Sequence, residues 1–275
     1  MNFYSSTEYL DAVSDVYFPA RRTSVQDVSI GNTALRCLVV DEKQVITESP
    51  FLDYHQPLQD LDIRIPTRPR VYAERVVKNV INSTEWDAEA LNRYLPAPFI
   101  KWSNFSNYDD YLRYVKSRSK GALREENRLK RRLSENVGKL EFSFDDTRED
   151  VLETALRWKS AQFVRTGLKD IFKEQKNVKF LKTLRKRRLL KSSTLRASDR
   201  LLSVMLGFEH EGTCSGWIFT YNPDPSLRRY SIGRQMLHHM LTESFHRGHN
   251  EFDFSIGAQD YKFLYSTHIR LLSGV

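Results

Sequence analysis

The chain has 275 residues, of which 40% are hydrophobic and 28% are charged, a composition typical of globular proteins. This length suffices for two small domains or one large one, with a sizeable core. No window approaches the roughly 18 consecutive apolar residues of a membrane-spanning helix. The N-terminus lacks the basic start and apolar run of a secretory signal. The two cysteines, Cys37 and Cys214, lie far apart and indicate neither a disulfide framework nor a metal site. We therefore expect a cytoplasmic protein.

The formal net charge of +8 is concentrated in two stretches of the sequence. Residues 116–139 contain nine basic and three acidic side chains, and residues 165–200 contain thirteen and three. The rest of the chain is therefore net acidic. Clustered positive charge creates a field that attracts nucleic acid, an anionic membrane surface or a phosphate-bearing cofactor. The alternative is that the two stretches are solvated faces of helices.

The N-terminal half is predicted to begin with a helix over residues 3–18 and a hairpin of strands 25–30 and 34–40 around Gly31-Asn32. Residues 45–47 extend this sheet. The following segments are expected in order: a loop with a short helix over 51–69, a helix or strand over 71–80, a turn into a helix at 82–86, and a break at Leu95-Pro-Ala-Pro. A long basic helix is then expected from Asn104 or Asn107 to about Asn136, before Gly138.

The C-terminal half alternates strands and helices. Its predicted elements are a strand over 140–144, a helix over 148–164 with Thr147 and Asp150 as a capping pair, a basic helix over 169–190, strands over 201–208 and 213–221, a helix from 232 to Gly248, and a strand over 251–256. The crossover of about 30 residues between the last two strands indicates that they are parallel neighbours.

The segment Tyr230-Ser-Ile-Gly233 enters the helix of this crossover. A helix N-terminus offers free N–H groups and the positive end of the helix dipole, which together suit a phosphate. Glycine lets a ligand approach the backbone closely. An ordinary strand-to-helix connection is the alternative, because many α/β proteins have a glycine here.

Residues 150–270 resemble the GNAT-like acyltransferases of the group related to the cellulose-biosynthesis acetyltransferases, which in turn resemble the Fem peptidyltransferases. The resemblance rests on these segments: Trp158-Lys159 with Gln162 and Arg165, Tyr221-Asn-Pro, Tyr230-Ser-Ile-Gly233, Gly248, Phe252-Asp-Phe-Ser-Ile-Gly257 and Tyr261-Lys262. The N-terminal half is similar less sharply, through Tyr17-Phe-Pro19, Arg36, Phe51-Leu-Asp-Tyr54, the basic helix at 118–133 and Glu135-Asn-Val-Gly138.

The resemblance implies a mixed α/β (α+β) fold in which a GNAT-like mixed β-sheet is flanked by helices, in two tandem halves. Residues 1–138 would be a degenerate GNAT-like domain, and residues 139–275 would carry the acyltransferase site. Related enzymes have Arg/Gln-x-x-Gly-x-Gly/Ala in the phosphate loop, but aligned on Gly233 this chain has Tyr230 and Gln235 at the outer places. The donor is therefore open between acyl-CoA, another acyl thioester and aminoacyl-tRNA.

Acyl transfer to an amine needs a polarised carbonyl, a deprotonated amine and a protonated leaving thiolate. It needs no nucleophile on the enzyme, and the chain has no G-x-S-x-G motif. The candidate catalytic residues are Asp253, Tyr261 and Lys262. Asp253 lies on the strand face opposite Phe252 and Phe254, with a structural role as its alternative. Lys262 is a candidate for contacting phosphate or oxyanion, or else a surface lysine.

Cofactor-binding residues are expected in the loop and first turn, namely Tyr230, Ser231, Ile232, Gly233 and Arg234. Tyr230 and Tyr261 are also candidate acids, each with packing as its alternative. Lys159, Gln162, Arg165 and Trp217 are expected to line the acceptor side. No metal is expected, because the adjacent His238 and His239 would point about 100° apart on a helix.

Three functions are consistent with these features. The first is transfer of an acyl group from acyl-CoA, as co-substrate, to an amine or hydroxyl of a small molecule, amino sugar or polysaccharide precursor. The second is aminoacyl-tRNA-dependent transfer, with the basic helices holding RNA; no aromatic residues interleave them as base-stacking modules require. The third is a non-catalytic binding protein that retains the fold.

Overall fold

A computed structural model describes residues 2–30, 33–58, 78–83 and 93–274. The chain forms two compact units. Unit 1 comprises Met1–Phe99, Gln175–Leu189 and Phe254–Val275, and unit 2 comprises Ile100–Glu174 and Leu190–Asp253. The units therefore exchange segments along the chain, and the expected domain boundary between residues 138 and 139 stays a prediction. None of the described helices is long and apolar enough to cross a membrane.

Unit 1 opens with the predicted helix and hairpin. After the short η1 (Phe3–Ser5) come α1 (Thr7–Tyr17), β1 (Thr23–Ile30), β2 (Thr33–Val40) and β3 (Gln44–Ile46), and the strands form an antiparallel sheet in that order. Helix α5 (Gln175–Lys186) packs on α1. The Tyr17 hydroxyl donates to Asn177 at 2.7 Å, and the rings of Tyr9 and Phe180 meet edge to face. Long-range contacts therefore bring the basic helix α5 into unit 1.

The predicted break at Leu95-Pro-Ala-Pro was wrong, because these residues begin strand β5 (Leu95–Lys101). Strand β11 (His268–Ser273) lies between β5 and β4 (Val80–Ser83) and is antiparallel to both. Pro96 and Pro98 occupy alternate positions, so their missing N–H groups lie on one edge of β5. On that edge their carbonyls accept from Gly257 N at 2.9 Å and Phe254 N at 3.1 Å. Both prolines fit the strand because this edge needs only their carbonyl oxygens as hydrogen-bond acceptors. The helix start expected at 82–86 falls partly on β4 and otherwise outside the described residues. Residues 59–77, which hold most of the loop expected over 51–69 and of the helix or strand expected over 71–80, also lie outside them.

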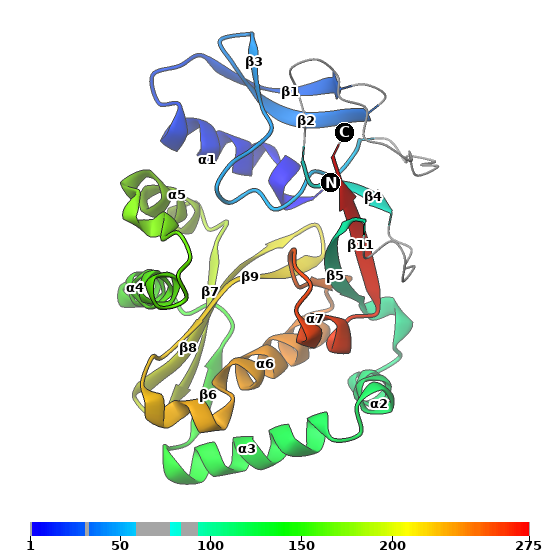
Figure 1. Cartoon of the computed structure of the whole chain (residues 1–275), viewed down its shortest axis with the longest axis vertical. Helices are drawn as coiled ribbons and strands as arrows, with labels where there is room; N and C mark the ends of the chain where they lie inside the picture. The colour runs from blue at the N-terminus through cyan, green and yellow to red at the C-terminus, as the bar shows by residue number, and fades with distance from the viewer. Residues whose placement is uncertain (1, 31–32, 59–77, 84–92, 275) are drawn as a thin grey trace. The chain divides into compact units, whose positions relative to one another are not determined.

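Unit 2 holds five neighbouring strands in the order β10 (Glu251–Asp253), β9 (Thr213–Tyr221), β8 (Arg200–His210), β7 (Lys191–Ala197) and β6 (Leu140–Ser143). All pairs are antiparallel except β9 and β10, whose predicted parallel pairing is confirmed. Helices α4 (Glu149–Arg165) and α6 (Ile232–His246) lie on either side of β8 and β9 (Figure 1). The strand predicted over 251–256 ends early, at Asp253, and Ser255 has a φ of +63°.

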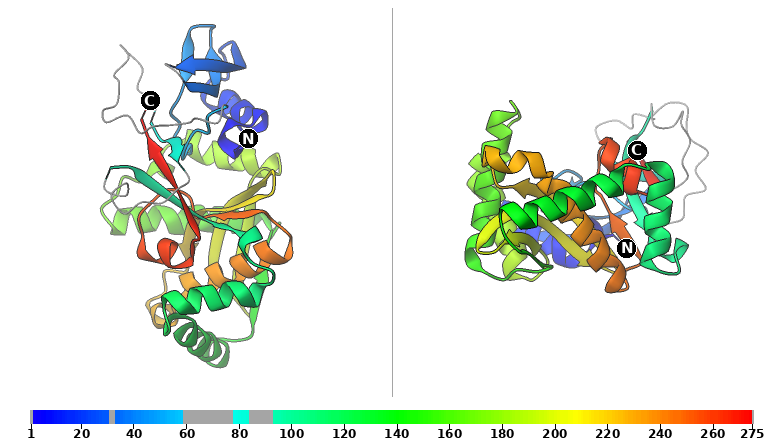
Figure 2. Two further views of the ribbon diagram at one scale, coloured as in Figure 1. Left: turned by 90° about the vertical axis from the view of Figure 1, so that its right-hand side faces the viewer. Right: turned by 90° about the horizontal axis from the view of Figure 1, so that it is seen from below.

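The single long helix predicted up to Asn136 is two helices, α2 (Tyr108–Arg118) and α3 (Ala122–Asn136). Asn107 caps α2 as expected, since its side-chain oxygen accepts from Asp110 N at 2.9 Å. Ser119 is extended, with a φ of −149°, and the chain turns there. This turn lets α3 lie alongside α6 (Figure 2). Leu129 and Leu133 provide the buried side of α3.

Two further elements differ from prediction. Strand β7, with the polar sequence KSSTLRA, was missed; its Ser193 and Thr194 hydroxyls are buried and hydrogen-bonded to Phe144 O and the Asp146 carboxylate. The basic helix expected from 169 starts only at Gln175, after the short η4 (Ile171–Lys173). Buried hydroxyls with partners let a polar segment occupy a central strand.

The turn into α4 is organised by Asp146 rather than by the predicted pair Thr147 and Asp150. Arg148 is the N-cap residue, and its N–H donates to the Asp146 carboxylate at 3.2 Å. The same carboxylate accepts from the Arg148 guanidinium and from Thr194 at 2.9 Å. Burial opposes the ionisation of Asp146, but these hydrogen bonds outweigh it and lower the pKa from 3.8 to about 2.

We predict that Asp146 makes the protein sensitive to acid. Its folded-state pKa lies below the unfolded value, so the carboxylate contributes stability above about pH 4 that is lost as the pH falls through about 2. The contribution at neutral pH is about 2 kcal/mol. Chemical denaturation as a function of pH should show this loss in the wild type and a smaller loss in Asp146→Asn. Equal slopes for the two proteins would contradict the assignment.

Candidate functional site

A tight connection joins β9 to α6. The chain leaves β9 at Tyr221, forms the short helix η5 (Pro225–Tyr230) and enters α6 at Ile232. Asn222 accepts from Asp224 N at 3.1 Å, and Asp224 in turn accepts from Ser226 N at 2.8 Å and pairs with Arg200. These bonds hold the connection, so the position of the α6 N-terminus relative to β9 is fixed by short-range contacts.

Ser231, the N-cap residue of α6, adopts a left-handed conformation with φ 49° and ψ 49°. It follows the 3-10 turn of η5, and a right-handed residue followed by a left-handed one directs successive N–H groups into an anion-binding concavity. Arg234 N makes the first bond back to Ser231 O, at 2.9 Å, so the N–H groups of Ile232 and Gly233 precede the hydrogen-bonded turn. A non-glycine residue in the left-handed conformation costs about 1 kcal/mol or more. Residues strained in this way often occur at functional sites.

A pocket of about 290 Å³ opens at this turn. Its lining residues are Tyr221, Asn222, Leu227, Arg228, Ser231, Ile232, Gly233 and Arg234. Arg228 and Arg234 are exposed, so their guanidinium groups add positive charge to the end of α6 that is already positive. The concavity, the helix dipole and the two arginines together suit a phosphate or pyrophosphate group.

Four of the five residues expected to bind the cofactor line this pocket, and Tyr230 does not. The Tyr230 side chain is 1% exposed and packs inside unit 2, with Arg229 over its ring at 5.0 Å. Sequence reasoning missed Tyr221, Asn222, Leu227 and Arg228. The clustered arginines at 228 and 229 were the available signal, but only the 3-10 turn of η5 determines which of the two reaches the pocket.

Strand β9 is irregular beside this pocket. Its register with β8 shifts so that Leu206 pairs with Ile218 and Gly207 with Gly216, which makes Trp217 the extra residue of a β-bulge. The pairing with β10 covers only Thr213–Ser215, and β9 continues beyond the end of β10 to Tyr221. The bulge therefore lies in the part of β9 that extends beyond the end of β10.

Phe219 connects β9 to both flanking helices. A Cβ placed on Gly233 would lie 3.0 Å from Phe219 Cε1, so a larger residue here would need the Phe219 ring to shift. On the α4 side, Lys159 Nζ donates to Phe219 O at 3.0 Å and lies 5.4 Å from the Phe163 ring centre. Burial lowers the pKa of Lys159. Gly233 therefore has a packing role against Phe219. That it also lets a ligand approach the backbone closely stays a prediction.

The other residues expected on the acceptor side are more dispersed. Gln162 is half-buried on α4, and its carbonyl accepts from Thr166 at the end of the helix. Arg165 is exposed at that end. Trp217 is half-buried, with its ring edge-on to Phe208 at 6.2 Å. Lys159 therefore contacts β9, Trp217 is part of β9, and Arg165 lies on the surface.

The three candidate catalytic residues are divided between the units. Asp253 ends β10 in unit 2 and is 1% exposed. Tyr261 and Lys262 lie in α7 (Asp260–Tyr265) of unit 1. Lys262 is not a surface lysine: it is 5% exposed, and its Nζ donates to Ile256 O at 2.6 Å and Ser255 O at 3.2 Å. Tyr261 is partly exposed, and partial burial raises its pKa.

Sequence reasoning also missed Asp53 and Ser255 as partners of this segment. The Ser255 hydroxyl donates to the Asp53 carboxylate, and Lys262 bonds the Ser255 carbonyl, all within unit 1. Asp53 belongs to the Phe51-Leu-Asp-Tyr54 segment. The contact spans 202 residues, and sequence spacing gives no sign of it.

A family model for the acetyltransferase (GNAT) domain matches residues 121–263, slightly more than half of the chain. The chain therefore belongs to the acetyltransferase (GNAT) domain family, as its sequence resemblance indicated. A comparison with curated protein sequences gives no match.

Two solved structures are similar over nearly the whole chain. The crystal structure of FemX covers 98% of this chain and 90% of its own length, with a TM-score of 0.54 and 10% identity. The C-terminal domain of a putative lysylphosphatidylglycerol synthetase from Agrobacterium fabrum covers 98% and 91%, with a TM-score of 0.50 and 8% identity. At these identities the likeness concerns the fold, and it confirms the expected mixed α/β architecture and the similarity to a Fem protein. Membership of the cellulose-biosynthesis group stays a prediction.

We predict that Gly233→Ala destabilises the protein through Phe219. The added methyl group would overpack the helix against the strand at a cost of about 1 kcal/mol or more. In a Phe219→Leu background the same substitution should cost less, because the ring is gone. Urea denaturation of the four proteins of this double-mutant cycle measures the coupling. An equal cost in both backgrounds would show that Gly233 is not required for packing.

Proposed function

We propose that the protein is an acyl-CoA-dependent N- or O-acyltransferase. The observation that carries this proposal is the left-handed turn at Ser231, which precedes the N–H groups of Ile232 and Gly233 and lines a pocket together with Arg228 and Arg234. A pyrophosphate is the group of acyl-CoA that such a site suits. Membership of the GNAT family supports the same assignment. The loop departs from the family pattern in sequence, but its backbone geometry can still hold phosphate.

In the proposed reaction the acyl group lies along β9 beyond Ser215, where β9 extends past the end of β10. Backbone N–H groups at the Trp217 bulge would polarise the thioester carbonyl. The acceptor nitrogen or oxygen attacks this carbon, the C–S bond breaks, the acceptor loses its proton and the thiolate gains one. No covalent enzyme intermediate and no metal are required. Lys159 would position β9 by holding the Phe219 carbonyl.

We assign the remaining candidates by the chemistry of their side chains. Asp253 is the proposed polar group at the end of β10, Tyr261 the proposed acid, and Lys262 a positioning residue that holds the segment after β10 through two carbonyls. The proposed acceptor is an amine or hydroxyl of a small molecule, amino sugar or polysaccharide precursor in the cytoplasm. Gln162 and Arg165 stay proposed contacts of that acceptor.

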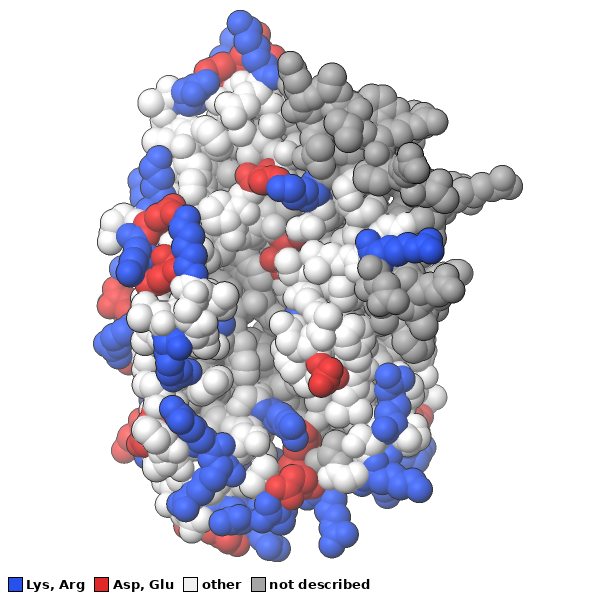
Figure 3. All heavy atoms as spheres, in the orientation of Figure 1, with Lys and Arg blue, Asp and Glu red and all other residues white. Residues whose placement is uncertain are grey.

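Aminoacyl-tRNA-dependent transfer is the second candidate, and the basic face of α3 favours it. Arg124, Arg128 and Arg131 are exposed at helical spacing, and Figure 3 shows lysine and arginine side chains gathered over this end of unit 2. Binding of tRNA would then weaken steeply with added salt. The third candidate, a non-catalytic GNAT-fold binding protein, would bind acyl-CoA or RNA stoichiometrically without turnover.

We predict that Arg228→Ala and Arg234→Ala each weaken acetyl-CoA binding about tenfold, the effect of losing one charge-assisted contact to phosphate. Arg229→Ala is the matched control, because Arg229 is exposed next to Arg228 and does not line the pocket. Calorimetric titration measures the dissociation constants. Thermal shifts with acetyl-CoA, longer acyl-CoAs and desulfo-CoA then identify the donor, because occupancy at a hundred times the dissociation constant adds about 2.7 kcal/mol.

The absence of any thermal shift with every CoA species would refute the acyl-CoA proposal and make aminoacyl-tRNA the donor to test, by titration at rising salt. Equal losses in all three arginine variants would indicate a diffuse electrostatic effect rather than this pocket. Binding without acyl transfer to any amine or hydroxyl acceptor would favour the non-catalytic candidate.

A further inference from the structure

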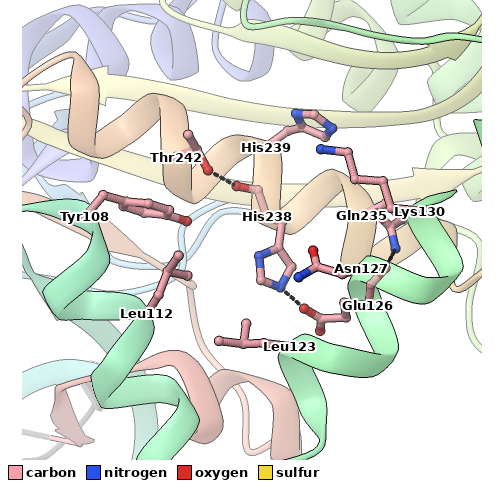
Figure 4. A pocket seen from close by; sticks show the side chains of 10 residues that line it. All are labelled: Tyr108, Leu112, Leu123, Glu126, Asn127, Lys130, Gln235, His238, His239 and Thr242. Atoms are coloured by element: carbon pink, nitrogen blue, oxygen red, sulfur yellow. Dashed lines mark hydrogen bonds and ion pairs between the residues drawn. The ribbon is translucent and has the colours of Figure 1, made fainter.

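A second pocket, of about 190 Å³, lies within unit 2 between α2, α3 and the side of α6 (Figure 4). Its lining residues are Tyr108, Leu112, Leu123, Glu126, Asn127, Lys130, Gln235, His238, His239 and Thr242. None of them lines the pocket at the α6 N-terminus. The proposed acyl-CoA site therefore does not account for it.

The spacing of the lining residues shows that two helices face each other through polar stripes. Helix α3 contributes residues 123, 126, 127 and 130, and α6 contributes residues 235, 238, 239 and 242. Both sets follow the i, i+3, i+4, i+7 pattern of a single helix face. Such facing stripes ordinarily carry apolar side chains, because buried polar groups cost free energy unless they are paired. Here seven of the eight residues are polar, so the two helices meet through hydrogen-bonding groups rather than through apolar packing.

The centre of the pocket is a buried contact between Glu126 and His238. Glu126 is 3% exposed and its carboxylate contacts His238 Nε2, and Gln235 Nε2 donates to the Glu126 backbone carbonyl at 3.0 Å. The contact joins α3 to α6. Glu126 is therefore already engaged by the protein, and a bound cation would have to compete with His238 for it.

Beside this contact, the edge of the pocket carries one lysine. Lys130 and Asn127 are exposed at its edge and offer N–H donors. The His239 ring stacks on Phe142 at 5.2 Å, and burial together with the charges of Lys130 and His238 lowers its pKa to about 4, so it is neutral at pH 7. Because Glu126 is engaged by His238, the charged side chain left at the edge of the pocket is that of Lys130. Arg124, Arg128 and Arg131 on the same helix strengthen the positive field outside it.

The opposite end of the pocket is apolar. Leu112 and Leu123 line it, and the Tyr108 ring lies beside Leu112 with its hydroxyl directed towards His238 (Figure 4). A cavity of about 150 Å³ can hold a molecule as large as benzene, so a pocket of this size takes a ligand of a few heavy atoms. One end would accept a single anionic group and the other a short hydrocarbon chain.

We propose that the pocket between α2, α3 and α6 is a second ligand site that binds a small monocarboxylate with a short apolar chain. The carboxylate accepts from Lys130 Nζ and the Asn127 amide, and the chain contacts Leu112 and Leu123. The site is independent of acyl-CoA binding and does not rest on the proposed acyltransferase activity.

The test uses butyrate as probe, with butylamine and butyramide as cationic and neutral analogues of similar shape. Ring C–H signals of the histidines, seven in the chain, are followed by NMR at pH 7 in the full-length protein. Butyrate is expected to shift the His238 and His239 signals saturably and to bind more tightly than either analogue. Lys130→Gln should weaken butyrate binding about tenfold through loss of a charge-assisted hydrogen bond. Lys116→Gln, on the exposed side of α2, should leave it unchanged.

Each alternative result would overturn the proposal. Tighter binding of butylamine would show that the Glu126 carboxylate determines the preference of the pocket, and that the pocket binds a cation. Equal binding of all three probes would show an apolar crevice without charge recognition. No shift of His238 and His239 with butyrate up to tens of millimolar, or an equal loss of affinity in Lys116→Gln, would mean that this pocket is not the site. Retained histidine signal dispersion in Lys130→Gln confirms that the variant is folded.

Discussion

The organisation of unit 2 depends on the contact between Phe219 of β9 and Gly233 of α6. Because glycine has no side chain, the first turn of the helix rests directly against the aromatic ring of the strand. The chain enters this helix through Ser231, which has a left-handed conformation. The N–H groups that follow this turn are the proposed anion site. Packing and the proposed ligand binding thus depend on the same turn, and substitutions that relax one are expected to disturb the other.

Three parts of the surface of helix α6 have different roles. Its N-terminus forms the proposed pyrophosphate site, one side packs on the sheet through Met236, Leu237, Met240 and Leu241, and another side faces α3 through the polar stripe around His238. An amphipathic helix in an ordinary two-layer contact needs only one buried face. The second, polar face requires α3 to be brought alongside, and the turn at Ser119 between α2 and α3 makes this possible. The pocket between the helices therefore depends on a break that separates two otherwise continuous helical segments.

Much of unit 2 could be predicted because its signals are local. Hydrophobic patterning and the crossover length identified β8, β9, α6 and the parallel β10. The expectation that residues 230–234 bind a cofactor phosphate stays a prediction. The errors arose where long-range contacts override local preference. Pro96 and Pro98 fit a strand because their missing N–H groups lie on an edge where only carbonyls are needed, and the polar strand β7 is stabilised by hydroxyl bonds to Phe144 and Asp146. The left-handed serine, the bulge at Trp217 and the role of Arg228 also lie beyond sequence reasoning, since none has a residue preference strong enough to reveal it.

The most direct test of the account is whether the amides of Ile232 and Gly233 bind phosphate. Backbone ¹⁵N–¹H spectra of the protein titrated first with pyrophosphate and then with acetyl-CoA would report on each N–H separately. The account predicts large, saturable downfield shifts of these two amides with both ligands, and small shifts for the amides of α3. If acetyl-CoA binds while the Ile232 and Gly233 signals stay in place, the anion site at the start of α6 is wrong, and the proposed function loses the observation that carries it.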